Sequence, residues 1–403
     1  MQRSSVLLVA TMDTKSREAN FLESCLKESG CPVLIMDAGI RGESPVPVTI
    51  SRHEVARAGG KTLSEVQSIG HEGKSLNIML EGACKIADAM YDKGVISGVI
   101  SLGGSMGTTL GTGVMRQFPI GIPKVMISTM ASRDTRAFVG TKDILMLHAV
   151  CDISGLNRFT KKIFQNGAMA LAGMVSRKHI DTSLDAPTIF VSTLGTTEKC
   201  VQEIRARLER DGKEVVVFHT VGSGGKAMEE LMKTETIEAV VDLSLHEMAD
   251  HRFGGDYDAG PERGSVALKK GIPVVLVPGN IDFLVAGPLE QTLKNFPDRP
   301  YHVHNSAITV VRSTPQEMET IARQIGDFCN AAPGRYSLVI PMKGFSAFDS
   351  KEGPLHDPQG PLRFFKALEA QLTDTSRIHS LPYHINDSEF SEAVIERFQD
   401  LLS

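Results

Sequence analysis

The first candidate for chemistry is a loop rich in glycine and hydroxyl side chains, GGSMGTT at residues 103–109. It follows the apolar run ISGVISL at residues 96–102 and precedes a helix-like segment. Glycines let a backbone approach a phosphate closely, and the free N–H groups and dipole at a helix start favour an anion. Because the loop matches neither G-x-G-x-x-G nor G-x-x-x-x-G-K-S/T, a tight turn without a ligand is the alternative interpretation. The candidate phosphate contacts are Gly103, Gly104, Ser105, Gly107 and Thr108.

Three further loops of the first half carry polar residues directly after apolar runs, at residues 13–15, 37–39 and 129–132. A helix cap explains one polar residue of the first loop but leaves Lys15 available to neutralise a phosphate. Asp37 stands where related folds bind ribose hydroxyls. Since the carboxyl ends of parallel strands meet at one sheet edge, the four loops together predict a nucleotide-sized site. The candidate nucleotide contacts in these three loops are Asp13, Thr14, Lys15, Asp37, Gly39, Thr129 and Ser132.

Ionisable side chains gather after the apolar runs of the second half, which lacks the glycine loop at the aligned position. Taken singly, each is explained by a solvated surface or a helix cap. Together, acids, histidines and arginines in several loops indicate a site for a small anion. In that site Arg263 would bind a substrate carboxylate, and His251 or His304 would transfer protons. The candidate catalytic residues are Asp250, His251, Arg263, His304 and Lys343.

Two motif-like segments of the second half fail on spacing or composition. His246 and His251 are five residues apart, whereas a zinc site on one helical face needs its histidines at i and i+4. In the segment VGSGGKAMEE (221–230), Ala227 replaces the Ser or Thr of a P-loop, and Thr220 occupies its first glycine position. We therefore predict neither a zinc site nor a P-loop here.

An internal repeat sets the elements that must position these loops. LLVATMDTK (7–15) aligns with IFVSTLGTT (189–197) at an offset of 182 residues. Each copy has the pattern strand, turn, amphipathic helix, glycine, strand, which predicts a βαβ unit. ISGVISLG (96–103) aligns with IEAVVDLS (237–244) at an offset of 141, so the first copy carries 41 extra residues.

The apolar runs are nearly continuous in Val, Ile and Leu and alternate with helix-like segments, which is typical of parallel strands covered on both faces. We predict an α/β protein of two tandem doubly wound parallel-sheet domains, with a Rossmann-like or flavodoxin-like strand order. The expected domains are residues 1–182, for nucleotide binding, and residues 187–403, for the substrate, with a boundary near 177–187. Residues 301–314 are expected to form a strand and residues 315–330 a helix.

The composition argues against several classes of protein. The 403 residues carry 43 Lys and Arg against 48 Asp and Glu, and the net charge of −5 argues against broad electrostatic binding of nucleic acid. No apolar run approaches the ~20 residues that cross a bilayer, and the N-terminus has no recognisable export signal. Six scattered cysteines without a C-x-x-C pair indicate reduced thiols. We therefore expect a cytoplasmic protein without nucleic-acid or membrane partners.

Nearly from end to end, the chain resembles the tobamovirus-resistance-protein-like family of ATP-binding domains, which includes a plant protein and many bacterial relatives. The resemblance implies two Rossmann-like domains, homodimers, and ATP bound at the first-half loops with Mg²⁺ alongside the triphosphate. The chain departs from the family at Arg133, where the pattern STMASGD has glycine, and in the more polar stretch HRFGGDYDAGPERG (251–264). The resemblance rests on VATMDTK (9–15), DAG (37–39), SLGGSMGTTLG (101–111), STMAS (128–132), DISGLNR (152–158), AGPERG (259–264), PGNIDF (278–283), HNSAITVVRST (304–314) and PMKGFSAFDSKEGPLHDP (341–358).

The loops and the resemblance together predict a cytoplasmic ATP-binding protein. The leading hypothesis is a metabolic enzyme that acts on a small carboxylated substrate in the cleft between its domains, by ligase-like activation or by phosphoryl transfer. A nucleotide-sensing regulatory module that binds ATP without turnover is the first alternative. An ATP-independent hydrolase or lyase is the second.

Overall fold

The computed structural model describes residues 4–176, 186–332 and 334–403. The chain divides into two compact units, Met1–Asp181 and Thr182–Ser403, here called the first and the second unit. Most of the boundary segment expected at residues 177–187 lies outside the described residues. Within the described ranges, every helix is too short or too polar to span a bilayer.

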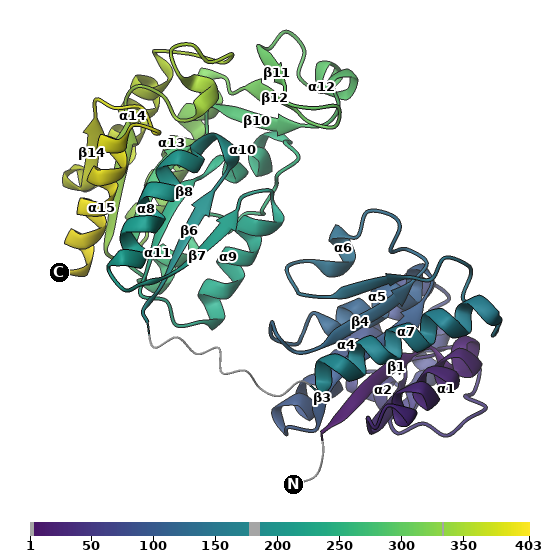
Figure 1. The fold of residues 1–403 in the computed structure, drawn as a ribbon. Coiled ribbons are helices and arrows are strands. Elements are labelled where there is room, and N and C mark those ends of the chain that lie inside the picture. The colour runs from purple at the N-terminus through teal and green to yellow at the C-terminus, as the bar shows by residue number, and fades with distance from the viewer. Residues whose placement is uncertain (1–3, 177–185, 333) are drawn as a thin grey trace. The chain divides into compact units, whose positions relative to one another are not determined.

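A parallel five-stranded sheet forms the centre of the first unit (Figure 1). Its strands are β1 (Ser5–Ala10), β2 (Val33–Asp37), β3 (Ile96–Gly103), β4 (Lys124–Ser128) and β5 (Leu145–His148). Its helices are α1 (Met12–Glu28), α2 (Arg52–Ala58), α3 (Leu63–Ser68), α4 (Glu72–Asp92), α5 (Ser105–Met115), α6 (Arg136–Val139) and α7 (Arg158–Val175).

Helices cover both faces of this sheet because successive side chains of each strand point in opposite directions. Leu8 of β1 belongs to the apolar core beneath α1 and α7. Its neighbour Leu7 belongs to the core beneath α2, α3, α4 and α5. The predicted doubly wound α/β architecture is therefore confirmed for the first unit.

The strand order of the first sheet is β2-β1-β3-β4-β5, which is the flavodoxin-like order. The direction of winding reverses between β1 and β3. In sheets of this kind, ligands bind outside the carboxyl ends of the strands at that reversal. The loops that follow β1 and β3 are therefore the ones placed to flank a ligand.

The second unit contains a parallel six-stranded sheet with the order β14-β13-β9-β8-β6-β7. Its strands are β6 (Thr188–Thr193), β7 (Glu214–His219), β8 (Ala239–Ser244), β9 (Val274–Gly279), β13 (Tyr336–Pro341) and β14 (Ile378–Leu381). Its helices are α8 (Glu198–Arg210), α9 (Ser223–Thr234), α10 (His246–Phe253), α11 (Val266–Lys270), α12 (Leu289–Asn295), α13 (Pro315–Asn330), α14 (Gly360–Gln371) and α15 (Ser388–Leu402), with short 3-10 turns η1 (Gly195–Thr197), η2 (Ala347–Asp349) and η3 (Thr375–Arg377).

The second unit repeats the topology of the first, as the internal repeat predicts. Its strands wind in the same flavodoxin-like order, extended by one strand at the β14 edge, and the winding reverses between β6 and β8. Helices α8 and α15 pack on one face of the sheet, and α9, α13 and α14 contribute to the core on the other face. The extra residues of the first copy lie between β2 and β3, where the first unit has α2, α3 and the 21-residue α4, whereas the second unit has the 12-residue α9 between β7 and β8.

One predicted strand of the second unit is in fact a hairpin. Residues 301–314 form two short strands, β11 (Tyr301–Val303) and β12 (Thr309–Arg312), which pair antiparallel. With β10 (Phe283–Ala286) they form a small separate sheet in the order β10-β12-β11. The sequence HNSA between the two strands turns the chain, so that His304 lies beyond the end of β11.

Local sequence explains where several helices begin. Thr314 caps α13, its hydroxyl accepting a hydrogen bond from the Glu317 N–H, while Pro315 opens the first turn. The predicted helix over 315–330 is confirmed.

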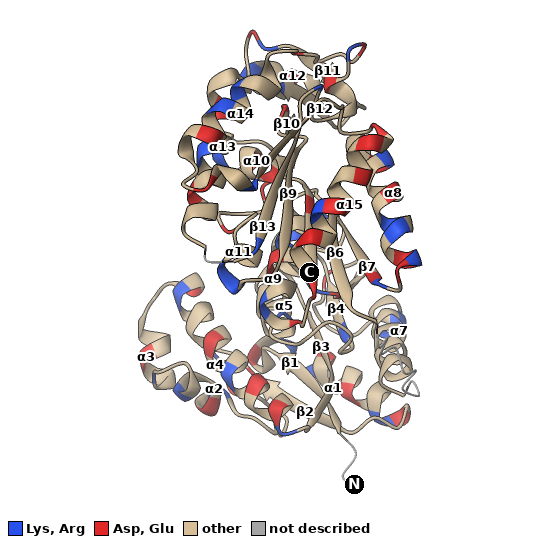
Figure 2. Cartoon of the chain, turned by 90° about the vertical axis from the view of Figure 1, so that its left-hand side faces the viewer, with Lys and Arg blue, Asp and Glu red and all other residues tan. Residues whose placement is uncertain are grey.

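Figure 2 shows that Lys, Arg, Asp and Glu lie mostly on helices and loops, whereas the strands are largely free of charge. This distribution fits sheets whose two faces are both buried.

Candidate functional site

A pocket of about 760 Å³ lies in the first unit. Because β1 and β3 flank the reversal of strand order, it occupies the place where this fold binds ligands. The loop after β1 contributes Thr11, Asp13, Thr14 and Lys15, and the loop after β3 contributes Gly103, Gly104, Ser105, Met106 and Gly107. The region after β2 contributes Ala38, Ile40, Arg41, Gln67, Gly70, His71, Glu72, Ser75 and Leu76, and Asp152 completes the lining.

The glycine loop turns the chain from β3 into α5. A Cβ on Gly103 would lie 2.7 Å from the Cα of Gly107, so this turn requires glycine. A Cβ on Gly104 would have Thr129 Oγ1 as its nearest neighbour, at 3.9 Å, which leaves room at this position. Gly104 is the N-cap residue and has no side chain with which to cap the helix. The start of α5 therefore presents N–H groups and the positive end of its dipole to the pocket.

Lys15 and Asp13 form part of the wall beside this loop. The Lys15 ammonium donates a hydrogen bond to the carbonyl oxygen of Ile153, which keeps a positive charge at the pocket. The Asp13 carboxylate accepts hydrogen bonds from the backbone N–H groups of Ile40 (3.1 Å) and Arg41 (2.9 Å). Asp13 therefore joins the loop after β1 to the loop after β2.

Asp37 has a different place from the one that the sequence suggests. Its carboxylate is buried and accepts hydrogen bonds from the N–H groups of Met12 (3.0 Å) and Gly39 (2.8 Å). Burial raises the pKa of this carboxyl. The described residues that line the pocket include neither Asp37 nor Gly39. Asp37 thus positions two loops, and a contact between its carboxylate and a ribose does not fit this geometry.

Three hydroxyl residues predicted to bind the nucleotide also stand apart from the described lining. Thr108 is completely buried, and its hydroxyl donates to the carbonyl oxygen of Gly104 (2.7 Å) and lies 2.6 Å from Ser128 Oγ. It therefore stabilises the glycine loop from behind. Thr129 lies close to Gly104, and Ser132 is exposed on the same loop.

Sequence reasoning missed one wall of the pocket. Ile40, Arg41, Gln67, His71 and Glu72 all belong to the stretch between β2 and the first turn of α4. No motif marks these residues, which are scattered along the stretch and, apart from Ile40, polar. The available signal was the 41-residue excess of the first copy, since a segment inserted directly after β2 starts at the same sheet edge as the predicted loops.

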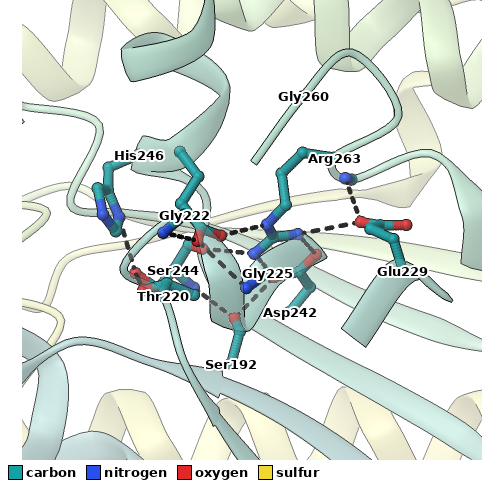
Figure 3. A network of polar contacts seen from close by, with 12 residues as sticks. Ser192, Thr220, Gly222, Gly225, Glu229, Asp242, Ser244, His246, Gly260 and Arg263 are labelled. Carbon is teal, nitrogen blue, oxygen red and sulfur yellow. Dashed lines mark hydrogen bonds and ion pairs between the residues drawn. The ribbon is translucent and has the colours of Figure 1, made fainter. Parts of the chain in front are cut away.

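In the second unit, Arg263 lies at the centre of a buried ion-pair network (Figure 3). Its Nη1 and Nη2 donate to the two carboxylate oxygens of Asp242, at 2.5 and 2.7 Å, and its Nε donates to Glu247 Oε2 at 2.7 Å. Burial opposes the charge, but Asp242 and the neighbouring carboxylates outweigh it and raise the pKa of Arg263. Because its donors are used inside the protein, Arg263 does not fit the predicted role of binding a substrate carboxylate.

Two glutamates of this network occupy helix starts. Glu247 Oε1 accepts hydrogen bonds from the N–H groups of Gly222 (2.7 Å) and Gly225 (3.2 Å) at the beginning of α9. Glu229 accepts from the Gly264 N–H at 2.5 Å, and burial raises the pKa of this carboxyl to about 7. Carboxylates of the protein itself thus take positions where a bound anion would be favourable.

Asp250 is also a structural residue. It is completely buried, and its Oδ1 accepts a hydrogen bond from the Val285 N–H at 3.0 Å, which joins α10 to β10. Burial raises the pKa of its carboxyl well above the usual range.

A second buried cluster stabilises the hairpin sheet. Here Arg312 donates a hydrogen bond to Asp349 (2.9 Å), and Asp282 accepts one from the Ser346 hydroxyl (2.7 Å).

The other predicted catalytic residues are exposed. The Nδ1 atom of His251 lies 2.8 Å from Asp258 Oδ1. Among the described residues, no hydrogen bond or ion pair joins His251, His304 and Lys343 to one another. In the described ranges, no group of three or more His, Cys, Asp or Glu side chains could hold a metal ion. The assignment of His251, His304 and Lys343 to one catalytic site stays a prediction.

The fold and the pocket define a tandem α/β protein, with two flavodoxin-like units related by a repeat and a glycine-loop pocket in the first. The chain belongs to the uncharacterised protein family UPF0261. The model of the N-terminal domain of that family matches residues 4–180, and the model of its C-terminal domain matches residues 186–402.

Curated relatives agree with this assignment. A UPF0261 protein from Clostridium tetani (strain Massachusetts / E88) is 36% identical over 398 residues, which cover 98% of each chain. The ToMV resistance protein Tm-1(GCR237) from Solanum lycopersicum is 32% identical over 419 residues, which cover 98% of this chain and 55% of that protein. These matches confirm the resemblance found in the sequence. Among solved structures, a UDP-GlcNAc 2-epimerase from Methanocaldococcus jannaschii matches with a TM-score of 0.22 at 11% identity, covering 98% of this chain and 99% of that one.

Proposed function

We propose that the first unit binds a nucleoside triphosphate, ATP in the first instance, with its phosphates at the glycine loop. The observation that carries this proposal is the uncapped start of α5, where Gly104 and Ser105 line a pocket at the reversal of strand order. N–H groups at such a helix start are suited to phosphate oxygens. The volume of about 760 Å³ is in the range of small-molecule sites.

The charges of the lining residues support a second part of the proposal, that Mg²⁺ accompanies the ligand. Lys15 and Arg41 supply two positive charges, while Asp13, Glu72 and Asp152 supply three negative ones. A bare polyanion would meet a net negative wall. Mg²⁺ bound to the phosphates would lower the charge of the ligand that meets this wall. We therefore expect nucleotide binding to require Mg²⁺.

The second half of the proposal concerns what the protein does with ATP. An enzyme that acts on a small carboxylated substrate would use the exposed candidates His251, His304 and Lys343. The burial of Arg263 and Asp250 removes two of the five predicted catalytic residues and favours, as a second candidate, a nucleotide-binding regulatory module. Loss of ATP that depends on a carboxylic acid would support the enzyme, and tight binding without ATP loss would support the module. We also propose a homodimer or a higher homo-oligomer, on the strength of the family resemblance, and a cytoplasmic location, on the strength of the six free cysteines.

The substitution Gly104→Asp tests the nucleotide site. Aspartate is a good N-cap residue and position 104 has room for a side chain, so we expect the fold to be retained. A carboxylate at the helix start would repel phosphate oxygens. We expect the dissociation constant for ATP with Mg²⁺ to rise roughly tenfold or more, as measured by isothermal titration calorimetry.

The matched control is Gly173→Asp, which adds the same charge to an exposed position of α7 in the same unit. A Cβ there has open space around it. This variant is expected to bind ATP like the unmodified protein. Equal ATP affinity in Gly104→Asp and Gly173→Asp would show that the glycine loop is not the phosphate site.

A further inference from the structure

One wall of the pocket belongs to the part of the first unit that the second unit lacks. Between β2 and β3 the first unit has α2, α3 and α4, whereas the described chain between β7 and β8 has α9 alone. From this extra wall Arg41, Gln67 and Glu72 line the pocket. The repeat therefore separates a shared part of the site, the glycine loop, from an added part.

The backbone that carries Arg41 is held from several directions. The Asp13 carboxylate accepts hydrogen bonds from the N–H groups of Ile40 and Arg41. The Gln67 side chain donates to the carbonyl oxygen of Ile40 at 2.6 Å, and the buried Arg52 donates to that of Gly42. Because the backbone of residues 40–42 is fixed in this way, movement at this place is concentrated in the Arg41 side chain.

The Arg41 side chain forms an ion pair with Glu72 at the first turn of α4. Both side chains are largely exposed, at 75% for Arg41 and 61% for Glu72. Ion pairs so exposed contribute little to stability, because water screens them and two long side chains must be ordered. The positive end of the α4 dipole also favours the Glu72 carboxylate when its partner leaves. Arg41 can therefore exchange its partner at low cost.

We propose that Arg41 determines the specificity of the pocket for ligands with several phosphates, by leaving Glu72 and binding the phosphate groups beyond the one held at the glycine loop. This inference rests on the proposed nucleotide function. Lys15 and the start of α5 together serve one phosphate. A guanidinium on a separate loop adds paired donors for the next phosphates, which a nucleoside monophosphate does not possess.

The test compares ATP and AMP binding to the full chain by isothermal titration calorimetry in the presence of Mg²⁺. We expect Arg41→Gln to weaken ATP binding roughly tenfold and to change AMP binding less than about twofold. Glu72→Gln should have the opposite sign and strengthen ATP binding a few-fold, because it removes the competitor for Arg41. A purely structural role for the pair would make both substitutions weaken binding.

The matched control is Asp152→Asn, which removes an equal charge from the pocket lining but not the partner of Arg41. In the Arg41→Gln background, Glu72→Gln should lose its advantage over Asp152→Asn. Equal losses of ATP and AMP binding in Arg41→Gln, or an undiminished effect of Glu72→Gln in that background, would overturn the inference. If Arg41→Gln binds ATP like the unmodified protein, the inference alone fails. If the unmodified protein binds no nucleotide, the proposed function fails and this inference with it.

Discussion

The loop that begins α5 and the loop that begins α10 occupy the same place in the two units but satisfy their polar groups in different ways. Residues 103–107 align with residues 244–248, and both loops follow the strand next to the reversal of winding. In the first unit the loop lines a pocket. In the second unit, His246 and Glu247 are completely buried.

In the second unit, Glu247 of the α10 loop binds the start of a neighbouring helix, α9, where an anion could otherwise bind. The N–H groups of Gly222 and Gly225 at the start of α9 receive the Glu247 carboxylate, and Arg263 pairs with the same carboxylate. A helix start that receives a carboxylate of its own chain no longer needs an external anion. At the start of α5, Gly104 and Ser105 supply no such carboxylate, and both residues line the pocket. The two units therefore share a topology but differ in electrostatics. The aligned loop lines a pocket in the first unit and belongs to a buried ion-pair network in the second.

The largest expected effect comes from breaking the internal ion pairs of the second unit. Arg263→Met keeps the volume of the side chain but leaves Asp242, Glu247 and Glu229 buried without their common partner. We expect the second unit to lose about 3 to 5 kcal/mol of unfolding free energy, measured by urea denaturation.

The control for this variant is Arg207→Met. Arg207 forms an exposed ion pair with Asp211 on α8, so its loss should cost about 1 kcal/mol or less. Since the first unit has its own apolar cores, ATP binding should be retained in Arg263→Met under conditions where the protein is folded. A stability loss as small as that of the control would contradict the network as a buried structural unit.

A pair of glycine substitutions sharpens the comparison between the closed and the open helix start. A Cβ on Gly225 would lie 1.8 Å from Glu247 Oε2 and 2.7 Å from Arg263 Nε, so Gly225→Ala should cost about 3 kcal/mol. Gly104→Ala places its methyl group 3.9 Å from its nearest neighbour, Thr129 Oγ1, without a clash, and should cost about 0.5 kcal/mol. Thermal and urea unfolding of both variants would measure this contrast, and equal losses would contradict it.

The architecture could be predicted because it depends on local pattern. Runs such as VLLVA and the repeat at offset 182 specify strand, turn and helix, and the resulting order of elements is confirmed. The prediction of a single strand at 301–314 was wrong. The four polar and small residues HNSA turn the chain inside an otherwise alternating segment, so that it forms a hairpin. The glycine loop was recognisable for the same local reason.

The roles of charged residues could not be predicted because they depend on contacts distant in sequence. Asp37 stands in a ribose-binding position along the chain, but its carboxylate turns toward Met12 and Gly39. Arg263 lies in a polar segment, AGPERG, yet its partners come from strands and helices 16 or more residues away. Arg41 belongs to no sequence motif, and it lies at the pocket because of the longer segment between β2 and β3 of the first unit.

His246 should give the stability of the second unit a pH dependence, with a smaller effect than the loss of Arg263 or the substitution of Gly225. Burial, with the nearby charge of Arg263, lowers the pKa of His246 from its usual value near 6.5 to about 3. Its Nδ1 atom lies 3.2 Å from Ser244 Oγ. Between these two pKa values the unfolded chain binds a proton that the folded chain does not, so acid favours unfolding. Lowering the pH from 6.5 to 5 should therefore remove about 1.5 kcal/mol through this residue.

Two carboxyls of the second unit act in the opposite direction. Burial raises the pKa of Glu229 and of Asp282 to about 7, so these groups bind protons in the folded state first and their contribution to stability falls as the pH rises toward 7. Comparison with His246→Asn cancels them, because both proteins contain the same carboxyls and asparagine can retain the bond to Ser244 without titrating. The unmodified protein should lose about 1.5 kcal/mol relative to the variant between pH 6.5 and 5, measured by urea unfolding at each pH. Parallel pH curves would mean that His246 binds its proton as readily in the folded protein as in the unfolded chain. The second unit would then carry a positive charge in the loop that aligns with the pocket loop of the first unit.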